Sequence, residues 1–117
     1  MNYEDFRVEM NEYRNRSIID SLDRKDSSYV YVLLHKFYEK RAMSSPEAML
    51  FAHRVIEEWT LADDVNMRMD AYDLIRHFRI ASLASALEAA AARSAVRPSK
   101  EAPSERMIIA RILDSLK

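Results

Sequence analysis

Glycine is absent from the 117 residues of this chain, although its average usage in proteins is about 7%. Tight hairpins, phosphate-binding loops and β-bulges rely on glycine, because it alone adopts positive φ at little cost. Helices joined by short polar turns lose little without it. The composition therefore predicts an all-α fold before any residue pattern is considered.

Cysteine is also absent, which excludes disulfides, thiolate nucleophiles and cysteine metal sites. No stretch approaches the roughly 18 apolar residues of a membrane span, and the first residues are charged. We therefore expect one cytoplasmic domain over residues 1–117 that makes no membrane contact. The net charge of −1 shows no basic excess, which argues against general nucleic-acid binding.

Apolar residues recur at three- and four-residue spacing in six segments, which predicts helices at about 2–23, 28–41, 46–59, 64–79, 81–94 and 104–116. Ser45-Pro46 and Asp64 are the clearest helix starts, because each supplies a capping side chain. The inward faces are expected to include Ile19 and Leu22 in the first helix and Ile108 in the last. Residues 96–103 contain two prolines without periodicity, which predicts a flexible surface loop.

The helix starts at Ser28, Asp64 and Ser104 repeat at intervals typical of a helical solenoid. With this phase, the second and third helices form one antiparallel hairpin, the fourth and fifth a second, and the sixth opens a third. About six helices in antiparallel hairpins are thus expected, arranged as a short solenoid or a compact helical bundle.

Residues 63–75 resemble the first helix of a HEAT-like repeat, and the resemblance extends over about residues 28–95. It is carried by an acidic cap, an arginine, an alanine, a leucine and two leucines of the following helix: Asp64, Arg68, Ala71, Leu74, Leu83 and Leu87. The chain departs from the family where His77-Phe78 replaces a common glycine, and it has fewer than three units. The resemblance implies a helical surface that binds other macromolecules.

The histidines give no sign of a metal or cofactor site. His35–Glu39 and His53–Glu57 have the i,i+4 spacing that places both side chains on one helical face. No third ligand joins either pair. The serines lie at helix caps and in loops rather than beside a base, so no nucleophile is predicted.

Charge is distributed unevenly along the chain. Residues 47–73 hold seven acidic side chains against two arginines, whereas residues 74–100 hold five basic side chains against one glutamate. Four of the acids should gather where the third helix ends and the fourth begins: Glu57, Glu58, Asp63 and Asp64. We call these four residues the acidic surface. Tyr31 flanks the inward face of its helix and is the preferred exposed aromatic residue.

These observations favour a non-enzymatic protein–protein interaction module, of an adaptor or toxin-neutralising kind, that presents the acidic surface and Tyr31 to a basic protein partner. The opposite charges of the two halves could also drive association between copies of the chain. A second hypothesis is a small-molecule sensor or enzyme with an inter-helix pocket and His53 or His77 at its mouth. A third is nucleic-acid binding through the basic half, by Arg76, Arg79, Arg93, Arg97 and Lys100.

Overall fold

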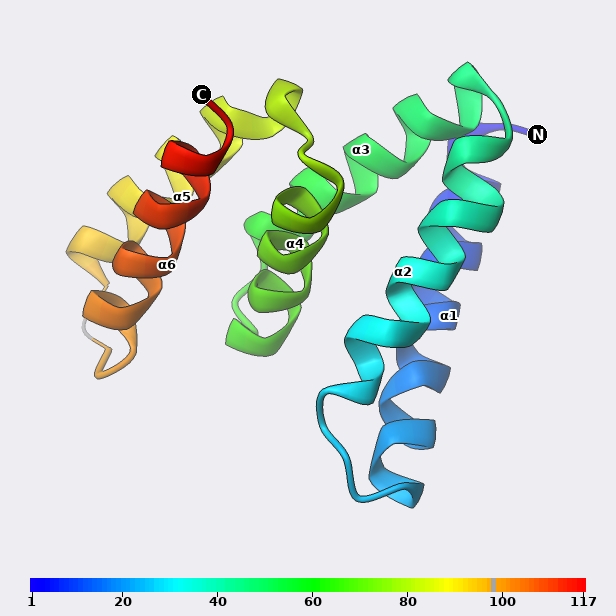
Figure 1. Cartoon of the computed structure of the whole chain (residues 1–117), viewed down its shortest axis with the longest axis horizontal. Coiled ribbons are helices and arrows are strands. Elements are labelled where there is room, and N and C mark those ends of the chain that lie inside the picture. The colour runs from blue at the N-terminus through cyan, green and yellow to red at the C-terminus, as the bar shows by residue number, and fades with distance from the viewer. Residues whose placement is uncertain (98) are drawn as a thin grey trace. The chain divides into compact units, whose positions relative to one another are not determined.

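The computed structural model describes residues 1–97 and 99–117, and every regular element in them is helical (Figure 1). The all-α fold class predicted from the sequence is confirmed. The α-helices are α1 (Tyr3–Asp23), α2 (Tyr29–Arg41), α3 (Pro46–Thr60), α4 (Val65–Phe78), α5 (Ala84–Val96) and α6 (Ala102–Ser115). Short 3-10 helices, η1 (Ala42–Ser44) and η2 (Ala81–Leu83), precede α3 and α5.

Local capping explains several helix boundaries. The Asn2 side chain accepts the amide of Asp5 at 2.8 Å, the Ser45 hydroxyl accepts the amide of Ala48 at 3.0 Å, and Asp64 caps α4. Ser28 precedes α2 but its side chain caps no amide; it donates to the carboxylate of Asp26 at 2.6 Å instead. The predicted helix starts at Ser45 and Asp64 are thus correct.

Two helix ends adopt the left-handed conformation without glycine. Lys25 follows α1 with φ of 55°, and Arg79 ends α4 with φ of 52°. Arg79 lets the chain turn into η2, and the amide of Ile80 then closes the end of α4 on the carbonyl of Ile75 at 3.0 Å.

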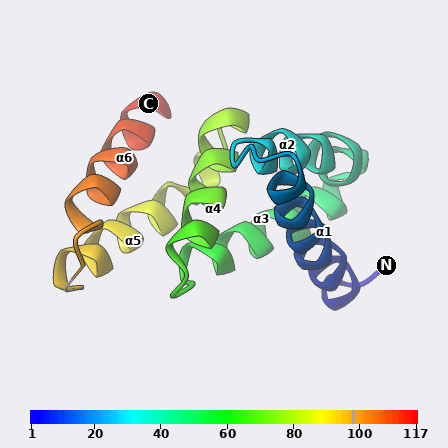
Figure 2. The same ribbon diagram turned by 90° about the horizontal axis from the view of Figure 1, so that it is seen from below.

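The chain divides into two compact units, residues 1–55 and residues 56–117. In the first unit α1 and α2 pack as an antiparallel pair (Figures 1 and 2). Phe6 is fully buried and contacts the rings of Phe37 and Phe51, with centroids 6.0 Å and 6.1 Å away. Aromatic contacts therefore connect α1 to both α2 and the first part of α3.

The second half of α1 differs from the prediction. Ile19 and Leu22 are 57% and 71% exposed, and the buried residues there are Arg14, Ser17 and Ser21. The hydroxyls of the two serines donate hydrogen bonds to backbone carbonyls of the same helix, that of Ser17 to Tyr13 and that of Ser21 to Ile18. The buried residues of α1 recur every three or four positions from Phe6 to Ser21, on one face of the helix. The prediction followed the apolar residues instead, and therefore assigned the wrong face to the second half of α1.

In the second unit α5 and α6 form an antiparallel pair, and α4 packs beside α6 (Figure 2). The closely packed pairs are therefore α1 with α2 and α5 with α6, one helix out of phase with the predicted hairpins. Caps mark where a helix begins but do not say which neighbour it packs against, which explains the error.

The last two helices also correct smaller predictions. Helix α5 continues through Val96 and α6 begins at Ala102, so the connection is shorter than the predicted loop at 96–103, of which Pro98 lies outside the described residues. Ile108 was expected to face inward but is 36% exposed, because the inward face of α6 follows Ala102, Glu105, Ile109 and Ile112. None of the described helices is long and apolar enough to cross a membrane.

Candidate functional site

The acidic surface lies in the second unit, at the end of α3 and in the connection to α4. Glu57 and Glu58 belong to the last turns of α3, and Asp63 and Asp64 precede α4. Glu57, Asp63 and Asp64 are exposed, whereas Glu58 is half-buried and has a contact within the chain. Asp64 also accepts the amide of Asn66 at 2.9 Å, so part of its charge serves the helix start.

An apolar side chain stands between the two acidic pairs. Leu61 is 56% exposed, while the preceding Trp59 and Thr60 are buried, at 2% and 1% exposure. Helix α3 ends at Thr60, and the leucine directly after it lies at the surface. An apolar residue surrounded by charged ones is the usual arrangement of a small protein interface.

Two arginines hold the backbone of this connection. Nη1 of Arg68 donates to the carbonyl oxygens of Ala62 and Asp63, both at 2.8 Å. Nη2 of Arg93, on α5, donates to the carbonyl of Thr60 at 3.3 Å. The last carbonyls of a helix have no partner within it, and the guanidinium of Arg93 supplies one to Thr60, while Arg68 binds two carbonyls of the connection that follows.

Arg68 is itself fixed by a buried carboxylate of α6. Its Nε donates to Oε1 of Glu105 at 2.7 Å and its Nη2 to Oε2 at 3.2 Å, and the two side chains are only 5% and 2% exposed. The hydroxyl of Tyr72, one turn further along α4, donates to the same Oε1 at 2.7 Å. Among the described residues, no buried side-chain nitrogen or oxygen lacks a hydrogen-bond partner.

The protonation states follow from these contacts. Burial alone would raise the pKa of Glu105, but the hydrogen bonds from Arg68 and Tyr72 outweigh it and leave the pKa below its ordinary value. The bond to Glu105 raises the pKa of Arg68, and burial, followed by the same carboxylate, raises that of Tyr72. All three groups keep their usual protonation at neutral pH, whereas general acid–base catalysis needs a group that titrates near it. The cluster therefore acts as a structural clamp.

Sequence reasoning missed Glu105 because a carboxylate was not expected inside. A signal was nevertheless present, since Glu105 lies four residues before Ile109 and seven before Ile112, on the inward face of α6. A charged residue at such a position requires a buried partner of opposite sign. Arg68 was noted only as part of the repeat resemblance.

The structure describes a partner for His53 and the surroundings of the other two histidines. Nε2 of His53 lies 2.8 Å from the hydroxyl of Tyr38, and burial lowers the pKa of this imidazole. His35 is half-buried, and exposed His77 contacts the ring of Phe78 with centroids 4.7 Å apart. Across residues 1–97 and 99–117, no three acidic or histidine side chains are grouped as a metal ion would require.

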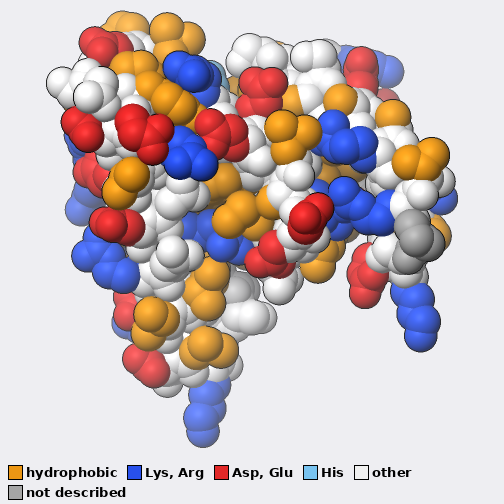
Figure 3. All heavy atoms as spheres, turned by 180° about the vertical axis from the view of Figure 1, so that it is seen from behind, with side chains coloured by type: hydrophobic (Ala, Val, Ile, Leu, Met, Phe, Trp, Pro, Cys, Tyr) orange, Lys and Arg blue, Asp and Glu red, His pale blue; other side chains and the backbone are white. Residues whose placement is uncertain are grey.

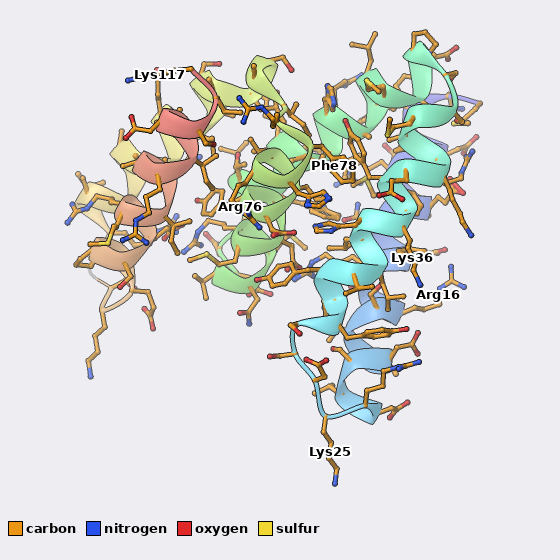
Figure 4. All side chains as sticks on the ribbon, in the orientation of Figure 1. Arg16, Lys25, Lys36, Arg76, Phe78 and Lys117 are labelled. Atoms are coloured by element: carbon orange, nitrogen blue, oxygen red, sulfur yellow. The ribbon has the colours of Figure 1, made fainter. Side chains whose placement is uncertain are left out.

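Two arginines of the basic half have partners within the chain. Arg76 pairs with Asp73 at 3.1 Å, and Arg93 is held on the carbonyl of Thr60. Figure 4 shows Arg76 on α4 and Lys117 beyond the end of α6. On the face of the molecule shown in Figure 3, acidic, basic and apolar side chains are intermixed. Arg79 and Lys100 are exposed, and nucleic-acid binding stays a hypothesis.

Tyr31 belongs to α2 in the first unit. The prediction placed it at the surface, but it is half-buried and has a contact within the chain. Its position beside the inward face of α2 explains this, because the packing of α1 on α2 also covers the flank of that face. The binding surface proposed below therefore does not include Tyr31.

Comparison with protein-family models, with curated proteins and with solved structures found no match to this chain.

Proposed function

We propose that this chain is a non-enzymatic protein-interaction module of the cytoplasm and that its acidic surface binds a basic segment of a protein partner. The observation that carries the proposal is exposed Leu61 between two pairs of carboxylates. Burial of such a leucine by a partner stabilises a complex by about 1.5–3 kcal/mol. The carboxylates around it would attract lysines and arginines and exclude acidic competitors.

Electrostatics at the end of α3 supports a basic partner. The partial negative charge at the carbonyl end of α3 is offset by the guanidinium of Arg93 on the carbonyl of Thr60, so the attraction depends on the exposed carboxylates. Exposed Glu57 and Asp63 carry full charges beside this helix end. Surface charges of one sign raise the association rate of an oppositely charged partner, and salt screens this effect.

The proposal is compatible with the HEAT-like resemblance, which remains a prediction. Repeats of that kind bind partners on helical surfaces without a catalytic pocket. A second copy of the chain is one partner that the charge distribution allows, because its residues 74–100 are basic. The experiment below would detect it, since copies of the chain that associate are captured together.

The decisive variant reverses three charges but keeps the helix cap: Glu57→Lys, Glu58→Lys and Asp63→Lys with Asp64 unchanged. Exposed Glu57 and Asp63 contribute little to stability, and circular dichroism would check that the variant, in which half-buried Glu58 also changes, stays folded. Tagged wild-type and variant chains would be used to capture partners from cells of the source organism, with mass spectrometry to identify them. We expect a stoichiometric basic partner with the wild type and its loss with the variant.

The purified partner would then be measured by surface plasmon resonance at several salt concentrations. Charge reversal should lower the association rate at low salt by about tenfold or more and remove its salt dependence. Leu61→Ser should mainly raise the dissociation rate, because it removes the apolar contact and leaves the charges.

A matched control reverses three exposed acids of α1: Glu12→Lys, Asp20→Lys and Asp23→Lys. It changes the net charge by the same amount at a different place. Equal loss in both variants would mean that only the net charge matters. A folded acidic-surface variant that keeps its partner with unchanged affinity and salt sensitivity would refute the proposed site.

A further inference from the structure

We infer that Arg68 and Arg93 are positioning residues for the acidic surface, and that the docking of α6 through Glu105 sets the backbone conformation of residues 60–63. The inference rests on the proposed function, since it explains how the binding surface is held ready. Its physical basis is a continuous set of hydrogen bonds from α6 through α4 to the connection that carries Leu61 and Asp63.

A single guanidinium makes the link. A guanidinium has five N–H donors. In Arg68 one edge is bound to both oxygens of Glu105, while Nη1 on the other side donates to the two carbonyls of the connection. Lysine could not replace it, because an ammonium group is a point donor on a flexible stem and cannot span both sites.

The link makes two events depend on each other. If α6 leaves its place beside α4, Arg68 loses the carboxylate that orients it, and the carbonyls of Ala62 and Asp63 lose their fixed donor. Conversely, a partner that binds the ordered connection must stabilise the docked state of α6 by the same free energy. Arg93 adds a second, independent bond from α5 to Thr60.

The backbone amides of Leu61 and Ala62 report on the clamp directly. They donate to the carbonyls of Glu58 and Trp59 at 3.0 Å and 3.2 Å, so their exchange with solvent measures how often the connection opens. The test variant is Arg68→Met, Tyr72→Phe and Glu105→Leu combined. Replacing a buried ionic cluster by apolar residues of similar volume often leaves the fold intact, so α6 should stay docked while the clamp is lost.

Exchange would be measured by nuclear magnetic resonance on the full chain without a partner. We expect exchange at Leu61 and Ala62 to be at least about tenfold faster in the variant, with Leu74 and Ile75 in α4 unchanged as internal references. Binding of an oligolysine peptide depends instead on the fraction of chains whose connection is ordered, so its affinity falls about tenfold only where the connection is open about nine tenths of the time.

The matched control replaces the partly exposed pair of the first unit by Glu9→Leu and Arg41→Met, which should leave Leu61 and Ala62 unaffected. Unchanged exchange at Leu61 and Ala62 in the clamp variant would overturn the inference, whatever the peptide affinity. If wild type fails to bind the peptide, the proposed function is contradicted, whereas the exchange rates still decide the clamp. Should the triple variant unfold, Arg68→Lys provides the same comparison, because it keeps the charge and loses the bonds to the carbonyls.

Discussion

Removal of the Glu105 carboxylate is the perturbation to which the second unit should be most sensitive. Glu105→Ala leaves the guanidinium of Arg68 and the hydroxyl of Tyr72 buried without their acceptor. Breaking a buried pair by removing one partner costs about 3–5 kcal/mol. At about 0.05–0.15 kcal/mol per residue, a unit of the size of residues 56–117 has a stability of about 3–9 kcal/mol. The substitution therefore removes a third or more of that stability.

The single tryptophan makes the effect measurable in the second unit. Trp59 is 2% exposed and belongs to residues 56–117, so its fluorescence should change when this unit unfolds in urea. With a denaturant slope of about 1 kcal/mol per molar urea, the midpoint should fall by about 3 M or the unit should unfold without urea. Far-ultraviolet circular dichroism would follow helix content in parallel.

The exposed pair of the first unit provides the comparison. Arg41 and Glu9 also form a short ion pair, at 2.9 Å, but their side chains are 36% and 41% exposed. Glu9→Ala should therefore cost only about 0–1 kcal/mol. If Glu105→Ala lowers the midpoint no more than Glu9→Ala does, then the clamp contributes nothing beyond a surface pair and our account of α6 docking is wrong.

Two further predictions concern buried positions. Ala71 has no exposed surface, so Ala71→Arg should unfold the second unit by overpacking and an unpaired charge; an unchanged melting temperature would show that the site can open to solvent. Burial lowers the pKa of His53, so the unfolded chain binds its proton more readily and the stability of the first unit should fall as pH drops below about 6.5. Urea midpoints between neutral and mildly acidic pH should show this slope in the wild type and lose it in His53→Asn.

Helix positions could be predicted from sequence because their signals are local. The Ser45-Pro46 and Asp64 starts depend on side chains within three residues of the amides that they cap. The pairing of helices could not be predicted in the same way, because it depends on contacts between distant segments. The repeat phase chosen from the caps was accordingly wrong by one helix.

The exposure of Glu57, Asp63 and Asp64 agrees with the sequence prediction, whereas the buried cluster of Arg68 and Glu105 was not predicted. Glu57 to Asp64 are close in sequence, so any turn after α3 keeps them together. Arg68 and Glu105 are separated by 37 residues, and only the packing of α6 beside α4 brings them into contact. A pattern based on apolar spacing also assigns charged residues to the surface, which hides a buried pair of this kind.

The left-handed residues Lys25 and Arg79 show how this chain turns without glycine, and they bear on the unfolded state as well. Each costs about 1–2 kcal/mol in the folded structure, which glycine would avoid. At average usage, however, a chain of this length would contain about eight glycines. Replacing a glycine by alanine where the backbone allows it stabilises a protein by about 0.4–1 kcal/mol, because the unfolded chain becomes less flexible. Summed over about eight positions, this gain in free energy matches or exceeds the cost of the two left-handed residues. Part of the stability of this protein is thus a property of the disordered chain, which has less conformational freedom to lose when it folds.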